Sequence, residues 1–244
     1  MSDPLLNVKD IHTYYGDSYV LQGISMQLEA GRIVAILGRN GMGKTTLIRS
    51  IAGLTPPRSG DVLFEGRLLR GCAPYAIAQR GIALVPQGRR IFCSLTVREN
   101  LLLPTSSLAR PRAGRWDLAA ILTEFPQLAD RIGNLGGALS GGEQQMLAVG
   151  RALMANPTLV LMDEPSEGLS PRLVLHVGEI MKRLREYGLA VMLVEQNLAL
   201  AMSVADDIYV LSSGQLVFHG TPQQLAKEPH ILNQHLGVGR KELQ

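Results

Sequence analysis

The sequence predicts an α/β fold with a mostly parallel sheet, and three observations support this prediction. An apolar run at residues 33–37 leads through a glycine-rich loop into a helical pattern at 45–52, as expected where a buried parallel strand meets its crossover helix. Strand and helix patterns alternate after residue 157, which is typical of a parallel sheet. Between these two parts helical periods dominate from about 87 to 157, which indicates a helical insertion in the α/β core.

The N-terminal part predicts a second, antiparallel β subdomain. Residues Leu6–Leu28 alternate apolar and polar positions around Tyr15-Gly16-Asp17, a pattern that favours antiparallel strands at an edge. A turn cluster at 55–60 follows the helix at 45–52. After this turn we expect a strand at 61–66, a helix at 73–80 and a buried strand at 82–86.

The insertion and the C-terminal part complete the predicted chain. Within the insertion, Pro104–Ser107 and Ala109–Gly114 are rich in turn-forming residues and predict an exposed loop. The remaining predicted elements are helices at 141–155, 171–187 and 197–204, and strands at 158–162, 189–194, 207–211 and 215–219. We therefore expect residues 1–244 to form a single domain with a helical insertion at about 87–157. Its C-terminal tail, 229–244, has one apolar patch and no chemistry that we assign.

Composition narrows the class of protein. The chain has 244 residues, a hydrophobic share of 46% and a charged share of 18%, values typical of a globular protein. A net charge of +3 is compatible with a nucleotide or an anionic membrane surface but too small to indicate nucleic-acid binding. Cys72 and Cys93 have no metal-ligand spacing, which favours a reduced, cytoplasmic compartment. No signal peptide and no membrane-spanning run of about 18 apolar residues is apparent, so we expect any action at a membrane to require partners.

The glycine-rich loop carries the pattern G-x-x-x-x-G-K-[ST], which is typical of the phosphate-binding loop of nucleoside triphosphatases. Its glycines allow backbone conformations in which successive N–H groups turn toward phosphate oxygens. Lys44 would contact the β- and γ-phosphates, and the Thr45 hydroxyl would bind Mg²⁺. The predicted nucleotide-binding residues of this loop are Gly38, Arg39, Asn40, Gly41, Met42, Gly43, Lys44, Thr45 and Thr46.

Two carboxylates follow the apolar strand pattern at 158–162. Asp163, at the end of this strand, is placed to hold Mg²⁺ beside the phosphate loop. Glu164, one residue further, is the candidate catalytic residue that polarises the water attacking the γ-phosphate. Either carboxylate alone would most often be a solvated loop residue, but an apolar strand ending in Asp-Glu-Pro downstream of a phosphate loop favours the catalytic interpretation.

The segment Leu139-Ser140-Gly141-Gly142-Glu143-Gln144-Gln145 resembles the LSGGQ-like signature of ATP-binding-cassette (ABC) ATPases. Ser140 is expected to cap a helix, and the two glycines after it expose backbone N–H groups at the positive end of that helix. The resemblance implies that Ser140, Gly141 and Gly142 bind the ATP held by a second subunit and not the ATP of their own phosphate loop.

The resemblance implies further site residues. Tyr15 resembles the aromatic residue that stacks on adenine, although an ordinary edge-strand tyrosine is the alternative. Gln87 resembles the glutamine that binds Mg²⁺ or the attacking water, with a plain loop glutamine as the alternative. Together with Thr45 and Asp163, Gln87 completes the expected Mg²⁺ ligands. Ser170 stands where the family usually has an aspartate in its dimer-contacting loop, so communication between the two ATP sites is expected to differ.

Gln196 is the largest departure from the family pattern. The family usually has a histidine at this position, which contacts the γ-phosphate, and we assign Gln196 to the catalytic set on that resemblance. A glutamine amide can donate a hydrogen bond but cannot take up a proton as imidazole does. Two interpretations stay open: slower hydrolysis that relies on Glu164, or a neutral replacement that keeps the contact.

Four segments resemble one subgroup of the family most: the ATP-binding subunits of branched-chain amino acid importers and their urea- or amide-importing relatives. These segments are Val85–Arg90, Leu139–Met146, Asp163–Leu169 and Val194–Asn197. The subgroup implies ATP and Mg²⁺, a second ATPase subunit that forms a heterodimer with this one, and two membrane-spanning permease subunits. It also implies indirect action with a periplasmic solute-binding protein, no nucleic acid, and a peripheral location on the cytoplasmic face of the inner membrane.

Two further classes of protein fit the sequence less well than the importer. A soluble ABC ATPase of DNA repair would carry long coiled coils between the phosphate loop and the signature, but residues 45–139 contain no heptad run. Ribosome-acting members of the family carry two cassettes on one chain, whereas this sequence has one phosphate loop and one signature. A regulatory cassette without turnover is supported only by Gln196, and the Asp163-Glu164 pair argues against it. The transported solute cannot be read from this chain, because the membrane and periplasmic subunits determine it.

Overall fold

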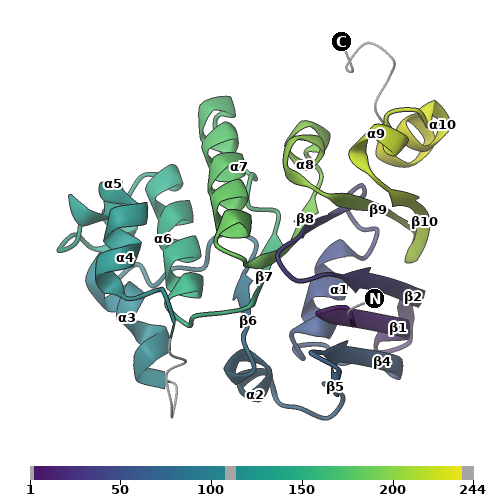
Figure 1. Cartoon of the computed structure of the whole chain (residues 1–244), viewed down its shortest axis with the longest axis horizontal. Coiled ribbons are helices and arrows are strands. Elements are labelled where there is room, and N and C mark those ends of the chain that lie inside the picture. The colour runs from purple at the N-terminus through teal and green to yellow at the C-terminus, as the bar shows by residue number, and fades with distance from the viewer. Residues whose placement is uncertain (1–2, 108–113, 238–244) are drawn as a thin grey trace.

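The computed structural model describes residues 3–107 and 114–237, and within these ranges ten strands form two sheets (Figure 1). The main sheet has the order β10-β9-β3-β8-β7-β6. Its strands from β9 to β6 are parallel, and β10 pairs antiparallel with β9 at one edge. The α/β class with a mostly parallel core is therefore confirmed. The strand bounds are β3 Ile33–Leu37, β6 Ile82–Val85, β7 Leu159–Asp163, β8 Ala190–Glu195, β9 Asp207–Ser212 and β10 Gln215–Gly220.

The centre of this sheet is buried on both faces because β3, β7 and β8 are apolar runs, the last two up to the carboxylate that ends each strand. Alternate residues of β3 enter two different cores: Ala35 packs in one with the larger set of helices, and Val34 in the other with the smaller sheet. Leu37 pairs in register with Glu195, and Asp163 with Val194. The carboxyl ends of β3, β7 and β8 thus meet at one edge of the sheet.

The smaller sheet is antiparallel and N-terminal, as the alternation in the sequence predicted. Its order is β2-β1-β4-β5, and the α1 helix (Lys44–Ile51) lies between it and the main sheet, with Leu47 and Ile48 buried in the core that the two sheets share. Its strands are β1 Leu6–Tyr15, β2 Ser18–Leu28, β4 Ser59–Phe64 and β5 Arg67–Leu68. The hairpin between β1 and β2 reaches the phosphate loop, since Tyr15 and Val20 line a cavity together with residues of that loop.

Between β6 and β7 the chain is helical and projects away from the smaller sheet (Figure 1). One expectation was wrong here: Pro104–Ser107 is the end of the α3 helix and not an exposed loop. Proline removes one backbone donor, but α3 packs against α6 through the fully buried Leu101, and this packing outweighs the lost hydrogen bond. Residues 109–113 of the other expected loop segment lie outside the described residues. The helices are α3 Val97–Ser107, α4 Leu118–Glu124, α5 Pro126–Ala129 and α6 Gly141–Leu153, with a 3-10 turn at Gly136–Ala138.

The remaining helices cover the main sheet and its C-terminal edge. The C-terminal segment buries Ile231 and Leu232 in the larger core, so the apolar patch of the tail is packing surface. These helices are α2 Pro74–Gln79, α7 Pro171–Glu186, α8 Leu198–Val204, α9 Pro222–Leu225 and α10 Pro229–Ile231, followed by a π-helical turn at Leu232–Leu236. In the part of the chain that the structure describes, none of the helices combines the length and apolar character needed to cross a bilayer.

Candidate functional site

The phosphate loop joins β3 to α1 at the edge where the strand ends meet. Gly41 and Gly43 have φ angles of +80° and +103°, conformations that glycine adopts at little cost. Gly38 is required for a different reason: a Cβ there would lie 2.4 Å from the carbonyl oxygen of Leu211 on β9. Two glycines thus permit the turn of the loop, and the third permits the close approach of β9.

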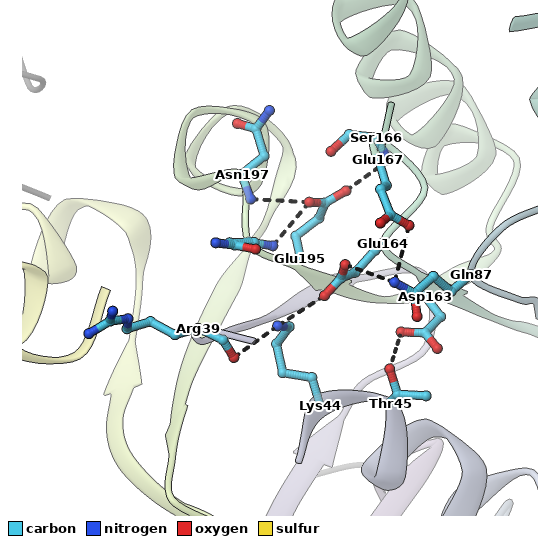
Figure 2. A network of polar contacts seen from close by, with 11 residues as sticks. Arg39, Lys44, Thr45, Gln87, Asp163, Glu164, Ser166, Glu167, Glu195 and Asn197 are labelled. Atoms are coloured by element: carbon cyan, nitrogen blue, oxygen red, sulfur yellow. Dashed lines mark hydrogen bonds and ion pairs between the residues drawn. The ribbon is translucent and has the colours of Figure 1, made fainter. Parts of the chain in front are cut away.

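Lys44 is buried and directly paired with the candidate catalytic glutamate. Its side chain is 4% exposed, and its Nζ lies 3.0 Å from Glu164 Oε1 and donates to the Arg39 carbonyl oxygen at 3.2 Å (Figure 2). Glu164 has a φ of 49°, a left-handed conformation uncommon for a residue with a side chain. Its own N–H donates to the Val194 carbonyl at 2.9 Å. This fixed turn after β7 directs the Glu164 carboxylate toward the phosphate loop.

Thr45 and Asp163 place two oxygen atoms side by side. The Thr45 hydroxyl donates to Asp163 Oδ1 at 3.1 Å (Figure 2). Burial raises the pKa of Asp163 to about 6, with the charge of Glu164 acting in the same direction and the Thr45 hydrogen bond and Lys44 opposing it. A buried carboxylate whose charge is unfavourable gains most from a cation, so this pair of hard oxygen donors suits Mg²⁺.

Gln87 connects the end of β6 to the loop after β7. Its Nε2 donates to Glu164 Oε2 at 3.3 Å and to Glu167 Oε2 at 3.1 Å (Figure 2). The amide therefore contacts the candidate catalytic carboxylate directly. Gln87 begins the segment that leads to the helical insertion. It is therefore held in place by hydrogen bonds to two carboxylates of the site.

A cavity of about 330 Å³ lies against the phosphate loop. Tyr15 stands at its side with 46% of its surface exposed, and its hydroxyl lies 3.5 Å from Thr55 Oγ1. Gly38, Arg39 and Met42 of the loop are outside the lining. The lining residues are Tyr15, Val20, Asn40, Gly41, Gly43, Lys44, Thr45, Thr46, Gln87 and Glu164.

The signature segment lies at a different place. Ser140 caps α6 by accepting from the Glu143 N–H at 3.3 Å, and Glu143 Oε2 accepts from the Ser140 N–H at 2.7 Å, a reciprocal cap at the helix start. Ser140 and Gly142 line a cavity of about 670 Å³ together with residues of α7. None of its lining residues belongs to the cavity at the phosphate loop. The signature segment and the phosphate loop of this chain thus line different cavities.

Gln196 follows β8 at the same edge as the phosphate loop, because β8 and β3 end in register. Its side chain is exposed and is not part of the phosphate-loop cavity. The residue before it, Glu195, is 2% exposed and was not identified from the sequence. Its carboxylate accepts hydrogen bonds from the N–H groups of Ser166, Gln196 and Asn197 (Figure 2).

The turn between β9 and β10 supports the phosphate loop through backbone hydrogen bonds. The Gly214 N–H donates to the Met42 carbonyl at 3.1 Å, and the Gly214 carbonyl accepts from the Gln22 N–H on β2 at 2.8 Å. The Ser213 N–H lies 3.1 Å from the Met42 sulfur. Met42 is thus oriented toward this turn and away from the cavity, and no motif signals the contact.

The fold and this site define a class of protein. The sequence profile of the ABC transporter family matches residues 21–167, more than half of the chain, so the chain belongs to the ABC transporter family. It is an ATP-binding subunit and an ATPase of that family, as the phosphate loop, the signature segment and the Asp-Glu pair indicate.

Particular members of the family resemble the chain over nearly its whole length. It is 40% identical to the high-affinity branched-chain amino acid transport ATP-binding protein BraG of Pseudomonas aeruginosa, over 96% of this chain and 100% of that protein. It is 33% identical to the lipopolysaccharide export system ATP-binding protein LptB of Escherichia coli, over 95% and 97%. A crystal structure of a nucleotide-free ATP-binding cassette from an ABC transporter superposes with a TM-score of 0.83 at 26% identity, covering 98% of this chain and 100% of that one.

Proposed function

We propose that this chain energises a bacterial importer of branched-chain amino acids or a related small polar solute. One observation supports ATP-driven pairing of this chain with a second ATPase subunit. The phosphate loop and the signature segment, the two halves of an ATP site in this family, line different cavities of the chain. Each half-site then requires a complementary half from a second ATPase subunit. The likeness to BraG over the whole chain supports the amino acid as solute.

In the proposed site, ATP lies in the cavity at the phosphate loop. Tyr15 stacks on the adenine, and the phosphate loop, of which Asn40, Gly41 and Gly43–Thr46 line the cavity, surrounds the phosphates. Lys44 contacts the β- and γ-phosphates, and the signature segment of the partner ATPase closes over the γ-phosphate, as Ser140–Gly142 of this chain do over the ATP of the partner. Glu164 holds the attacking water, and Gln196 donates a hydrogen bond near it. Binding would close the pair, and hydrolysis would reopen it.

Thr45, Asp163 and Gln87 would hold Mg²⁺, which when bound supplies charge stabilisation to the phosphates. The described residues contain no group of three or more His, Cys, Asp or Glu side chains placed to hold a metal alone. The oxygens of these three side chains beside a phosphate loop nevertheless fit Mg²⁺, which keeps several waters and takes phosphate oxygens as ligands.

We propose that the chain works as a single nucleotide-binding domain, with residues 87–157 as the insertion that contacts the permease and 229–244 as the C-terminal tail. It would sit peripherally on the cytoplasmic face of the inner membrane with two permease subunits and a different second ATPase. A periplasmic binding protein would deliver the solute.

Likeness to LptB makes lipopolysaccharide-type export the second candidate. Import of urea or an amide, or ATP hydrolysis by a soluble cassette, would use the same site residues.

The test is to purify the full chain at native abundance from solubilised membranes and to identify its partners by mass spectrometry. Two permeases and a second, histidine-containing ATPase would support the importer. The complex, placed in vesicles with the binding protein encoded beside it, should then hydrolyse ATP faster with leucine than with urea. Recovery with a lipopolysaccharide-binding assembly, or with ribosomes or DNA, would overturn the proposal.

A further inference from the structure

Glu195 is a buried carboxylate for which the reaction described above has no use. It ends β8 with 2% of its surface exposed. Its Oε1 accepts from the Ser166 N–H at 3.0 Å, and its Oε2 accepts from the N–H groups of Gln196 and Asn197, both at 3.1 Å. Among the described residues it forms no ion pair with Lys, Arg or His, so these backbone N–H groups take the place of a cation.

The two oxygens hold two different segments. Ser166 lies two residues after Glu164, in the loop that the family uses for contact between subunits. Gln196 and Asn197 form the first residues after β8. Figure 2 shows the carboxylate between these segments. Glu195 is therefore a cross-link between the loop that carries the catalytic glutamate and the segment that carries Gln196.

The position of Glu164 depends on this cross-link for a physical reason. Glu164 keeps a left-handed φ of 49°, which is strained for a residue with a side chain. Such a conformation persists only where the surroundings fix it. The surroundings here are the Glu164–Val194 backbone hydrogen bond before the turn and the Ser166–Glu195 hydrogen bond after it.

Charge and shape explain why a glutamate occupies this position. All three partners are donors, so the side chain must offer acceptors on both terminal atoms. A glutamine of equal length would offer one oxygen and would place its NH₂ group against a backbone N–H. Burial disfavours the charge and raises the pKa of Glu195, while the hydrogen bonds from Ser166, Asn197 and Gln196 oppose that rise.

We propose that Glu195 is a positioning residue for ATP hydrolysis, which holds the loop after Glu164 and the segment at Gln196 in one fixed arrangement. The proposal rests on the proposed role of Glu164. Glu195 does not line the nucleotide cavity, so its removal should affect the chemical step and leave ATP binding nearly intact.

The test uses the full chain with Glu195→Gln, and Glu186→Gln as a matched control. Glu186 is exposed near the end of α7 and its substitution removes the same charge. We expect Glu195→Gln to lower kcat roughly 10- to 100-fold, as small misplacements of catalytic groups do. KM and the affinity for a fluorescent ATP analogue should change less than about twofold, and Glu186→Gln should match the wild type.

A merely structural role predicts another result. It would lower the unfolding temperature while kcat per folded molecule stays unchanged, or it would lower ATP affinity in parallel with kcat; either outcome overturns the proposal. If Glu195→Gln does not fold, the same measurements are made on Glu195→Asp, which keeps the charge but is too short to reach both segments. The same fall in kcat with nearly unchanged ATP affinity is expected, and an unchanged kcat overturns the proposal. Glu164→Gln is measured beside it. If Glu164→Gln loses turnover and Glu195→Gln does not, only the positioning role of Glu195 is refuted. If Glu164→Gln keeps full turnover, the catalytic role of Glu164 is refuted as well.

Discussion

The Nζ of Lys44 lies 3.0 Å from Oε1 of Glu164, so the cation expected to bind phosphate is paired with the carboxylate expected to activate water. Both side chains are largely buried, at 4% and 11% exposed. A phosphate group that binds Lys44 must therefore compete with Glu164. Nucleotide binding and the placement of the catalytic carboxylate are linked through this one contact.

Glu164→Gln should raise the affinity for ATP by about tenfold, which corresponds to about 1.4 kcal/mol, because the neutral amide competes less well for Lys44. Turnover should fall at least about 100-fold, and the ATP-bound pair should stay closed. Titration with a fluorescent ATP analogue, phosphate release and size-exclusion chromatography measure these effects. Glu167→Gln is the control, since Glu167 accepts from Gln87 and the carboxylate paired with Lys44 is that of Glu164; it should leave ATP affinity within about twofold. Full turnover in Glu164→Gln would refute the assigned role.

Lys44→Ala should abolish ATP binding and also lower stability by about 3 kcal/mol, because it leaves a buried carboxylate without its cation. The double variant with Glu164→Gln should recover most of that stability but no ATP binding. Urea unfolding of the four chains gives the coupling energy of the pair. A coupling energy near zero would show that the contact contributes nothing to the fold.

Asp163→Asn should alter the pH dependence of stability in the absence of Mg²⁺ and nucleotide. Burial raises the pKa of Asp163 from 3.8 to about 6, so the folded chain holds this proton more tightly than the unfolded one. The contribution of the protonated Asp163 to the free energy of unfolding is fully present below pH 3.8. It is lost as the pH rises through about 6, and the loss amounts to at most about 3 kcal/mol. Thermal unfolding should thus show a more stable Asn variant at about pH 7.5 and little difference near pH 4. An equal difference at both pH values would contradict the assignment.

Gly142→Ala should block ATP-driven pairing without weakening ATP binding at the chain's own phosphate loop. An added Cβ would lie 2.8 Å from Cδ1 of Leu173, and it would also cover the N–H groups at the start of α6. Cross-linking in the Glu164→Gln background reports pairing, and analogue titration reports binding. If binding and pairing fall together, the two half-sites are not separate.

Much of the fold and site could be predicted because the relevant residues follow one another in the sequence. The phosphate loop, the Asp163-Glu164 pair and the Ser140 cap each occupy a short segment with its own pattern. The central strands β3, β7 and β8 could be located because they are buried on both faces and are apolar up to the carboxylates that end β7 and β8. Their bounds were predicted to within a few residues.

The rest depends on contacts between distant residues. The local sequence at Pro104 predicts the end of a helix, but the helix continues to Ser107 because the buried Leu101 packs it against the core. Glu195 looks like the polar end of a strand, and its partner Ser166 lies 29 positions away. The Lys44–Glu164 pair and the support of Met42 by the β9–β10 turn likewise join segments that no local pattern relates. The roles of Tyr15, Gln87 and Gln196 stay predictions.

The order of strands in the main sheet has a consequence for synthesis on the ribosome. β3 precedes the phosphate loop, yet its two neighbours in the sheet are β8 and β9, which begin at Ala190 and Asp207. At about 5–20 residues per second, the apolar strand Ile33–Leu37 waits roughly 8 to 30 seconds before either neighbour has been made. The nascent chain must shield this strand by other means throughout that interval. The phosphate loop therefore gains its folded surroundings only after β8 and β9 have been synthesised.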